Sequence, residues 1–118
     1  MKPTVLLLVC ACLALTLSSC KVERRKSDAE LGLNPQQATG RGIFDARCAR
    51  CHEAYSSSDL QGPSLKGLFK KQYMSSGIPA NDERVKELIR FGRSKMPAYG
   101  QILTQQQLDD LMAYLHTL

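Results

Sequence analysis

The clearest alternation of hydrophobic and polar positions lies near the end of the chain. Thr104 and Gln107 have the spacing of a capping box, in which each side chain hydrogen-bonds the backbone N–H of the other residue. The apolar residues that follow recur at the helical repeat and are Leu108, Leu111, Met112, Leu115 and Leu118. The pattern predicts a final helix whose apolar face, with Met112 on it, packs in a core, and an exposed His116 near the helix end.

A second periodic segment covers residues 81–92. Acidic residues stand in its first turn, and Val85, Leu88 and Ile89 form an apolar stripe along one face. Gly92 stands where such a helix would end. The segment is therefore predicted to be a core helix.

The first helix of the globular part is predicted to begin at Asn34 and Pro35, an N-cap residue followed by proline at the first helical position. The apolar residues available for its inner face are Ala38, Ile43 and Phe44. Gly40 and Gly42 each weaken a helix by about 1 kcal/mol relative to alanine. A glycine here needs a packing reason, and the close approach of another helix would supply one.

The pattern contains no convincing strand. After residue 52 the chain becomes irregular, with the turn-forming runs Ser56-Ser57-Ser58 and Gly62-Pro63-Ser64. We therefore expect an all-α fold of three main helices joined by long loops.

The N-terminal segment has a different character. Lys2 precedes an apolar run over residues 5–17, which is too short for a comfortable membrane span and typical of a secretory signal. The run ends in Leu17-Ser18-Ser19-Cys20, which resembles a bacterial lipoprotein signal in which the cysteine receives the lipid. We predict that residues 1–19 are a signal peptide and that Cys20 is lipidated. The alternative is an ordinary cleaved signal with an unrelated cysteine.

The stretch after Cys20 is charged in both signs and has almost no apolar face. Such a composition cannot offset the entropy of ordering, so residues 20–34 are predicted to be the lipidated cysteine and a mobile tether, followed by one domain over residues 35–118. Fourteen extended residues reach at most about 45–50 Å.

Candidate chemistry is concentrated in Cys48-Ala49-Arg50-Cys51-His52, which has the Cys-x-x-Cys-His form of a c-type haem attachment motif. On one helical turn the two thiols project to the same side and can both add to the vinyl groups of one haem. His52 would then bind iron through Nε2, while its other ring nitrogen needs an acceptor that fixes the tautomer. A thioredoxin-like pair, a structural zinc site and a plain disulfide are the competing interpretations.

The cysteine count favours haem over these alternatives. Cys10 and Cys12 leave with the predicted signal, Cys20 takes the lipid, and Cys48 and Cys51 take the haem. All five cysteines are used without a disulfide bond, although exported chains normally use cysteines for bridges.

Two loop residues are candidates for completing the iron site. The carbonyl of Pro63 could accept the Nδ1 proton of His52, unless this proline is only a turn former. Met96 precedes a proline and therefore lies on an extended loop, from which its soft sulfur could reach iron. A surface methionine in a turn is the plain alternative, and Met74 is a rival ligand.

Taken together, these residues resemble the class I c-type cytochromes with one haem. The resemblance covers residues 40–118, and its matches in chain order are Gly40 with Phe44, the Cys-x-x-Cys-His motif, Gly62-Pro63, Met96-Pro97, and Leu111 with Tyr114. It implies one covalently bound haem c wrapped by three helices and long loops. It also implies that the first and last helices cross at these glycine, aliphatic and aromatic positions, and that the Pro63 carbonyl takes the His52 hydrogen bond.

The chain departs from many members of the family because it has no tryptophan. The groups that would meet the haem propionates are therefore only suggested, and they are Tyr73, Arg93 and Tyr99.

The resemblance implies function as well. With His52 and Met96 on the iron there is no site for a substrate, so the expected role is one-electron transfer by a protein that is not an enzyme. The basic residues Lys66, Lys70, Lys71, Arg93 and Lys95 come from loops expected to border the haem. They predict redox partners with acidic docking surfaces, rather than nucleic acid or a small-molecule substrate.

The expected location is the periplasmic side of a membrane. Lys21 follows Cys20, where an aspartate is associated with retention at the inner membrane, so the outer membrane is preferred. Two other functions stay open. One is a fixed subunit of a respiratory oxidase or periplasmic dehydrogenase, and the other is a haem sensor or peroxidase with an open sixth site.

Overall fold

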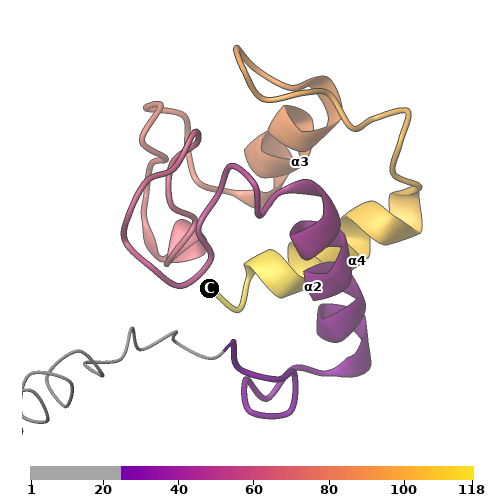
Figure 1. The fold of residues 1–118 in the computed structure, drawn as a ribbon. Helices are drawn as coiled ribbons and strands as arrows, with labels where there is room; N and C mark the ends of the chain where they lie inside the picture. Colours follow the sequence, from indigo (N-terminus) through magenta and orange to yellow (C-terminus); the bar gives the residue numbers. More distant parts are fainter. Residues whose placement is uncertain (1–24) are drawn as a thin grey trace, which may run out of the picture.

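A computed structural model of the chain describes residues 25–118 (Figure 1). This part contains three α-helices, α2 (Pro35–Arg47), α3 (Asp82–Phe91) and α4 (Gln105–Leu115), and a short 3₁₀ turn, η1 (Leu68–Lys70). The described residues form no β-strand. The prediction of an all-α fold with three main helices is therefore confirmed.

The helices begin where the capping residues predicted. Asn34 and Gln37 form a reciprocal capping box at the start of α2, and Thr104 and Gln107 form one at the start of α4. The side chain of Asn81 accepts from the third backbone N–H of α3 at 3.0 Å. Each helix therefore has one of its unpaired N-terminal donors satisfied by a local side chain.

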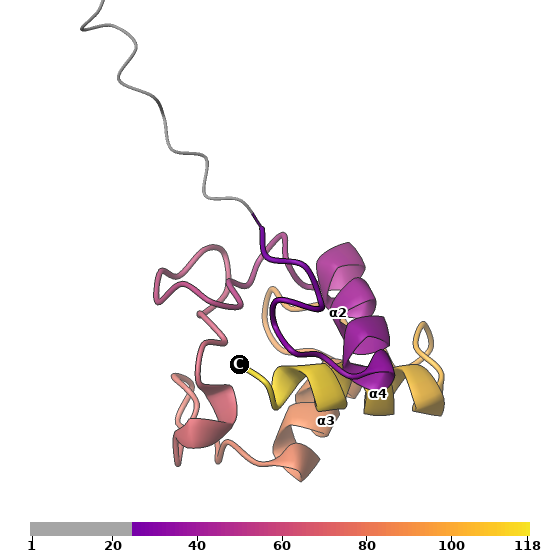
Figure 2. The same ribbon diagram turned by 90° about the horizontal axis from the view of Figure 1, so that it is seen from below.

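Helix α4 packs against both α2 and α3, and Figures 1 and 2 show it lying between them. The contact with α2 depends on Gly40, where an added Cβ would lie only 1.9 Å from the Asp110 carbonyl oxygen. The rings of Phe44 and Tyr114 meet at the same crossing, with centroids 5.4 Å apart. The packing reason expected for Gly40 is thus present. Gly42 has nothing within 4 Å of such a Cβ, so the expectation of a packing reason was wrong there.

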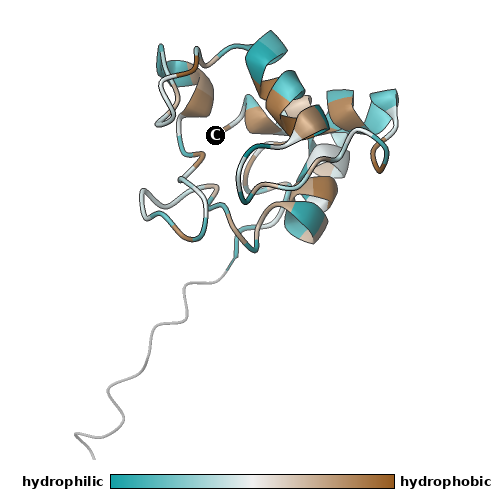
Figure 3. Cartoon of the chain, turned by 90° about the horizontal axis from the view of Figure 1, so that it is seen from above, coloured by the Kyte–Doolittle hydropathy of each residue, from teal (hydrophilic) through white to brown (hydrophobic). Residues whose placement is uncertain are grey.

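The core consists of the apolar faces of the three helices together with Ala54, Leu68 of η1 and Leu118 after α4. Figure 3 shows hydrophobic stretches on all three helices and mostly hydrophilic loops. Met112 is buried, as its place in the helical repeat predicted, and His116 is exposed. The two most deeply buried side chains are Leu111 and Tyr114, each 1% exposed, and both belong to α4.

The charged segment before α2 is more ordered than predicted. Residues 27–33 form a hydrogen-bonded turn, and Arg41 of α2, only 4% exposed, bonds the Asp28 carboxylate and the Lys26 carbonyl. Arg25 also pairs with Asp45. A buried guanidinium requires hydrogen-bond partners. The bonds to Lys26 and Asp28 therefore hold this segment against α2. The predicted tether is therefore folded at its C-terminal end.

The predicted signal peptide and Cys20 lie outside the described residues. Within residues 25–118, no helix combines the length and the apolar character needed to cross a membrane.

Candidate functional site

The Cys-x-x-Cys-His motif forms one further turn after α2. Cys48 caps the helix, and its carbonyl accepts from the backbone N–H groups of Cys51 and His52, at 3.0 Å each. Both thiols are free and half-buried, so the alternative of a disulfide between them is not realised. Among the described residues, no three acidic, cysteine or histidine side chains gather as they would around a zinc ion.

The two thiols have different surroundings. Burial, with smaller contributions from Asp45 and Cys51, raises the pKa of Cys48 to about 11, so this thiol keeps its proton at neutral pH. The Cys51 thiol donates to the side-chain oxygen of Gln61, 3.7 Å away, which orients it from the following loop.

The imidazole of His52 is held by one backbone carbonyl. Its Nδ1 lies 2.7 Å from the oxygen of Pro63, the acceptor that the sequence suggested. A carbonyl can only accept, so Nδ1 carries the proton and donates it. Nε2 is then left with its lone pair, which is the state that a metal ligand requires.

Gly62 contacts the His52 ring, a role that the sequence did not predict although Gly62 belongs to a predicted turn and to the Gly62-Pro63 family match. An added Cβ at this position would lie 2.5 Å from Cε1 and 2.9 Å from Nδ1 of the His52 ring. The backbone of Gly62 therefore packs flat against the imidazole, and its N–H donates to the Cys51 carbonyl at 2.8 Å. The signal that could have identified it is its position directly before Pro63, since close backbone approach favours glycine.

Met96 lies in a tight two-residue turn. Its backbone N–H and carbonyl both pair with Arg93, at 2.9 and 3.1 Å, and Ser94 within the turn has φ +52°. The loop folds back on the end of α3, where a Cβ on Gly92 would lie 2.5 Å from the Met96 carbonyl oxygen. Gly92 is thus more than the predicted helix stop, because it lets the Met96 loop approach the helix.

The rival methionine lies in a similar turn. Met74 accepts and donates backbone hydrogen bonds with Gly77 and Ile78, at 2.9 and 2.8 Å, beside a bridge between Tyr73 and Pro79. Both methionines are half-buried and pack against the core, so burial alone does not distinguish Met96 from Met74.

One side chain connects the Met96 loop to the haem motif. The hydroxyl of Tyr99 donates to the carbonyl oxygen of Arg47, the last residue of α2, at 2.9 Å. Burial and the nearby Cys48 raise the pKa of Tyr99, so the hydroxyl is protonated at neutral pH. Tyr99 was one of three residues suggested as partners of the haem propionates, and its hydroxyl proton is donated to the Arg47 carbonyl instead. The other two, Tyr73 and Arg93, are exposed.

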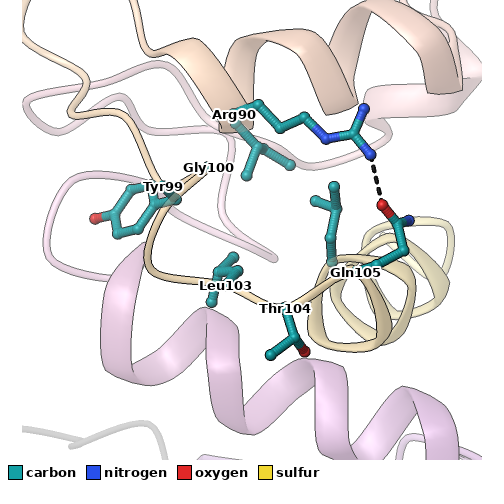
Figure 4. A pocket seen from close by; sticks show the side chains of 8 residues that line it. Arg90, Tyr99, Gly100, Leu103, Thr104 and Gln105 are labelled. Atoms are coloured by element: carbon teal, nitrogen blue, oxygen red, sulfur yellow. Dashed lines mark hydrogen bonds between the residues drawn. The ribbon is translucent and has the colours of Figure 1, made fainter.

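A small cavity of about 120 Å³ lies behind Tyr99, between the end of α3 and the start of α4. Figure 4 shows the Tyr99 hydroxyl pointing away from the hydrogen bond between Arg90 and Gln105, which measures 2.7 Å.

These features define a class of protein. A helix that ends in two free, half-buried thiols, followed by a histidine whose Nδ1 is bonded and whose Nε2 is left for a metal, has the donor set of a covalently attached haem. The described site fits that group.

Comparison with known proteins identifies the family. A family model described as "Cytochrome C oxidase, cbb3-type, subunit III" matches residues 35–115. A cytochrome c6 from Rippkaea orientalis is 31% identical over 78 residues, which are 66% of this chain and 67% of that protein. A cytochrome c6 from Tetradesmus obliquus is 27% identical, covering 67% and 86% of the two chains. A cytochrome c6-like protein from Nostoc is 29% identical, covering 75% and 72%.

The chain therefore belongs to the class I c-type cytochromes, and it carries one covalently bound haem c. It is an electron-transfer protein of this family.

Proposed function

We propose that this cytochrome is a lipid-tethered one-electron carrier on the periplasmic side of a membrane. In this proposal Cys48 and Cys51 attach the haem, and His52 and Met96 ligate its iron. When bound, the haem supplies the one-electron chemistry, and the chain holds and encloses it. The hydrogen bond from His52 Nδ1 to Pro63 is the observation that carries the proposal, because it prepares Nε2 for iron.

The sixth ligand decides between a carrier and a catalyst. Met96 is supported by its half-buried position and by the backbone turn that fixes its loop against α3. A thioether on the sixth position leaves the iron without a place for substrate and favours the ferrous state. Electron transfer, and not chemistry on a bound molecule, is then the function.

The partners proposed are redox proteins with acidic docking surfaces. Support comes from the net charge, which is +5 for the full chain and stays positive without Lys2 of the predicted signal. It also comes from five basic residues that are all exposed, Lys66, Lys70, Lys71, Arg93 and Lys95. Complementary charges accelerate association and make it dependent on salt. We accordingly expect electron-transfer rates with such a partner to fall as ionic strength rises.

The membrane attachment rests on the sequence around Cys20. Several acyl chains on one cysteine would give stable attachment, and Lys21 supports the outer membrane as the location.

A second candidate function is a fixed subunit of a respiratory oxidase. It is favoured by the description of the matching family, which names a subunit of a cbb3-type oxidase.

One purification and one binding measurement test these proposals. Detergent extraction from native membranes should yield the cytochrome alone if it is a carrier, and in constant proportion to other subunits if it belongs to a complex. Carbon monoxide should bind the reduced protein slowly and weakly. Rapid binding by the unmutated protein would refute the closed iron and favour a sensor or peroxidase.

A further inference from the structure

Both the backbone and the side-chain hydroxyl of Tyr99 form hydrogen bonds with other segments. The function proposed above assigns no role to these bonds. Its backbone N–H donates to the Ile89 carbonyl at 2.9 Å, and the next N–H, from Gly100, donates to the Arg90 carbonyl at 3.0 Å. Gly100 allows this contact, because a Cβ there would lie 2.9 Å from the Arg90 oxygen. The main chain three residues after Met96 is thus attached to the end of α3.

The side chain of Tyr99 reaches in the other direction. Its hydroxyl donates to Arg47, directly before Cys48, at 2.9 Å, while its ring packs against the core. The two segments that would supply the ligands of the haem iron, the Cys-x-x-Cys-His turn and the Met96 loop, are far apart in sequence. A single phenol hydroxyl links them directly.

We propose that Tyr99 is a positioning residue, whose hydrogen bond to Arg47 holds the Met96 loop closed against the haem-attachment turn and so opposes dissociation of Met96 from iron. This inference rests on the proposed ligation by Met96. On one side Met96 is held by the turn with Arg93, which packs on Gly92, and on the other side by Tyr99. A ligand held at both ends loses little entropy on binding and has few alternative positions.

The test measures how readily an external ligand displaces the sulfur. Imidazole is titrated into the ferric holoprotein, and Tyr99→Phe is compared with the unmutated chain. Removal of one hydrogen bond that holds the closed state should make imidazole binding about 3- to 10-fold tighter. The absorption band from sulfur to ferric iron should disappear at correspondingly lower imidazole concentration.

Tyr55→Phe is a matched control. It also removes one tyrosine hydroxyl from a hydrogen bond of 2.9 Å, here to Tyr114 of α4. Both variants should lose some resistance to denaturant, but only Tyr99→Phe should bind imidazole more tightly. Equal imidazole affinities in the two variants would reduce Tyr99 to a general structural role and overturn the proposal.

The same substitution in a Met96→Ala protein separates the proposed role of Tyr99 from the assignment of Met96 as the iron ligand. In Met96→Ala, further replacement of Tyr99 by Phe should leave imidazole affinity unchanged, because there is no sulfur to displace. If the double variant still binds more tightly than Met96→Ala, Tyr99 acts by another route and the proposal is wrong. If Met96→Ala alone matches the unmutated protein in its absorption band and imidazole affinity, the ligand assignment itself has failed.

Discussion

The tautomer of His52 is determined by a single backbone carbonyl. Because the Pro63 oxygen can only accept, the proton is placed on Nδ1 and the lone pair on Nε2. The acceptor belongs to the main chain, so the side chain of residue 63 matters only for the shape of the loop. The flat contact with Gly62 adds a steric constraint on the ring.

Gly62 restricts the His52 ring sterically and Pro63 supplies the acceptor carbonyl. Substitution by alanine at each position tests these two roles. Gly62→Ala must displace the imidazole or the loop, since the new Cβ would lie 2.5 Å from the ring. We expect it to lower the free energy of unfolding of the holoprotein by about 1–3 kcal/mol. It should also shift the reduction potential. Pro63→Ala keeps the carbonyl and should change the potential much less. Guanidinium unfolding and redox titration measure both effects, and a larger shift in the Pro63 variant would contradict the assigned roles.

The identity of the sixth ligand is the second question at the residue scale. Met96→Ala should lower the reduction potential, abolish the sulfur-to-iron absorption band and allow rapid carbon monoxide binding, because the soft donor that favours ferrous iron is lost. Covalent attachment should persist, since Cys48 and Cys51 are unchanged. Met74→Ala is the control and should do none of this. Loss of the band in the Met74 variant alone would assign the ligand to the other loop.

At the scale of elements, the crossing of α2 and α4 organises the molecule. Helix α2 ends at the haem motif, and α4 supplies five of the eleven buried hydrophobic side chains, so the packing of the two helices places the motif relative to the core. Gly40 allows the two backbones to approach, and the Phe44–Tyr114 ring contact fills the space beside it.

The two glycines of α2 provide a matched pair for testing this crossing. Gly40→Ala would place a methyl group 1.9 Å from the Asp110 carbonyl, which forces the helices apart. The expected loss is about 3 kcal/mol in the free energy of unfolding. Gly42→Ala meets open space and should stabilise the protein by up to about 1 kcal/mol through helix propensity. Denaturant unfolding of both holoproteins measures the difference, and similar values for the two would contradict the close crossing.

At the scale of the whole molecule, the protein core is thin. The described chain buries eleven hydrophobic side chains, and a domain of this size gains little stability from its own core. A covalently bound porphyrin would then be the largest apolar body in the fold. Folding and haem attachment are expected to be coupled for this reason.

Replacement of both Cys48 and Cys51 by alanine tests that coupling. No haem should remain on a denaturing gel, because neither thioether can form. The resulting protein should show much less helix by circular dichroism than the holoprotein. Covalent haem that survives the double replacement would refute the attachment site, and a fully helical apoprotein would refute the dependence of folding on haem.

The membrane anchor is the last property of the whole molecule. Cys20→Ser should release a soluble holoprotein, since the acyl chains would have no attachment point. Cys12→Ser, within the predicted signal, should leave the distribution unchanged. Haem staining of washed membranes and of the soluble fraction measures both. If all the stain remains with the membranes in the Cys20 variant, the lipid anchor is wrong.

The sequence by itself determined the elements and the chemistry of the motif. Capping boxes, helical repeats and the Cys-x-x-Cys-His spacing are local, so the bonds that define them join residues a few positions apart. The helix starts at Asn34 and Thr104 and the buried face of α4 were predictable for this reason. The Pro63 acceptor was one of two interpretations of a turn sequence, and the family resemblance favoured it over a plain turn former.

Tertiary structure decided the contacts that join distant segments. Helix propensity does not distinguish Gly40 from Gly42, and only the family resemblance singled out Gly40. The approach of α4 is what makes a side chain impossible at Gly40 and harmless at Gly42. Arg41 is buried despite its charge, and its bond to Asp28 holds the turn of residues 27–33 against α2. The bond from Tyr99 to Arg47 spans 52 positions. Such contacts follow from the packing of whole helices and loops, which no short window of sequence contains.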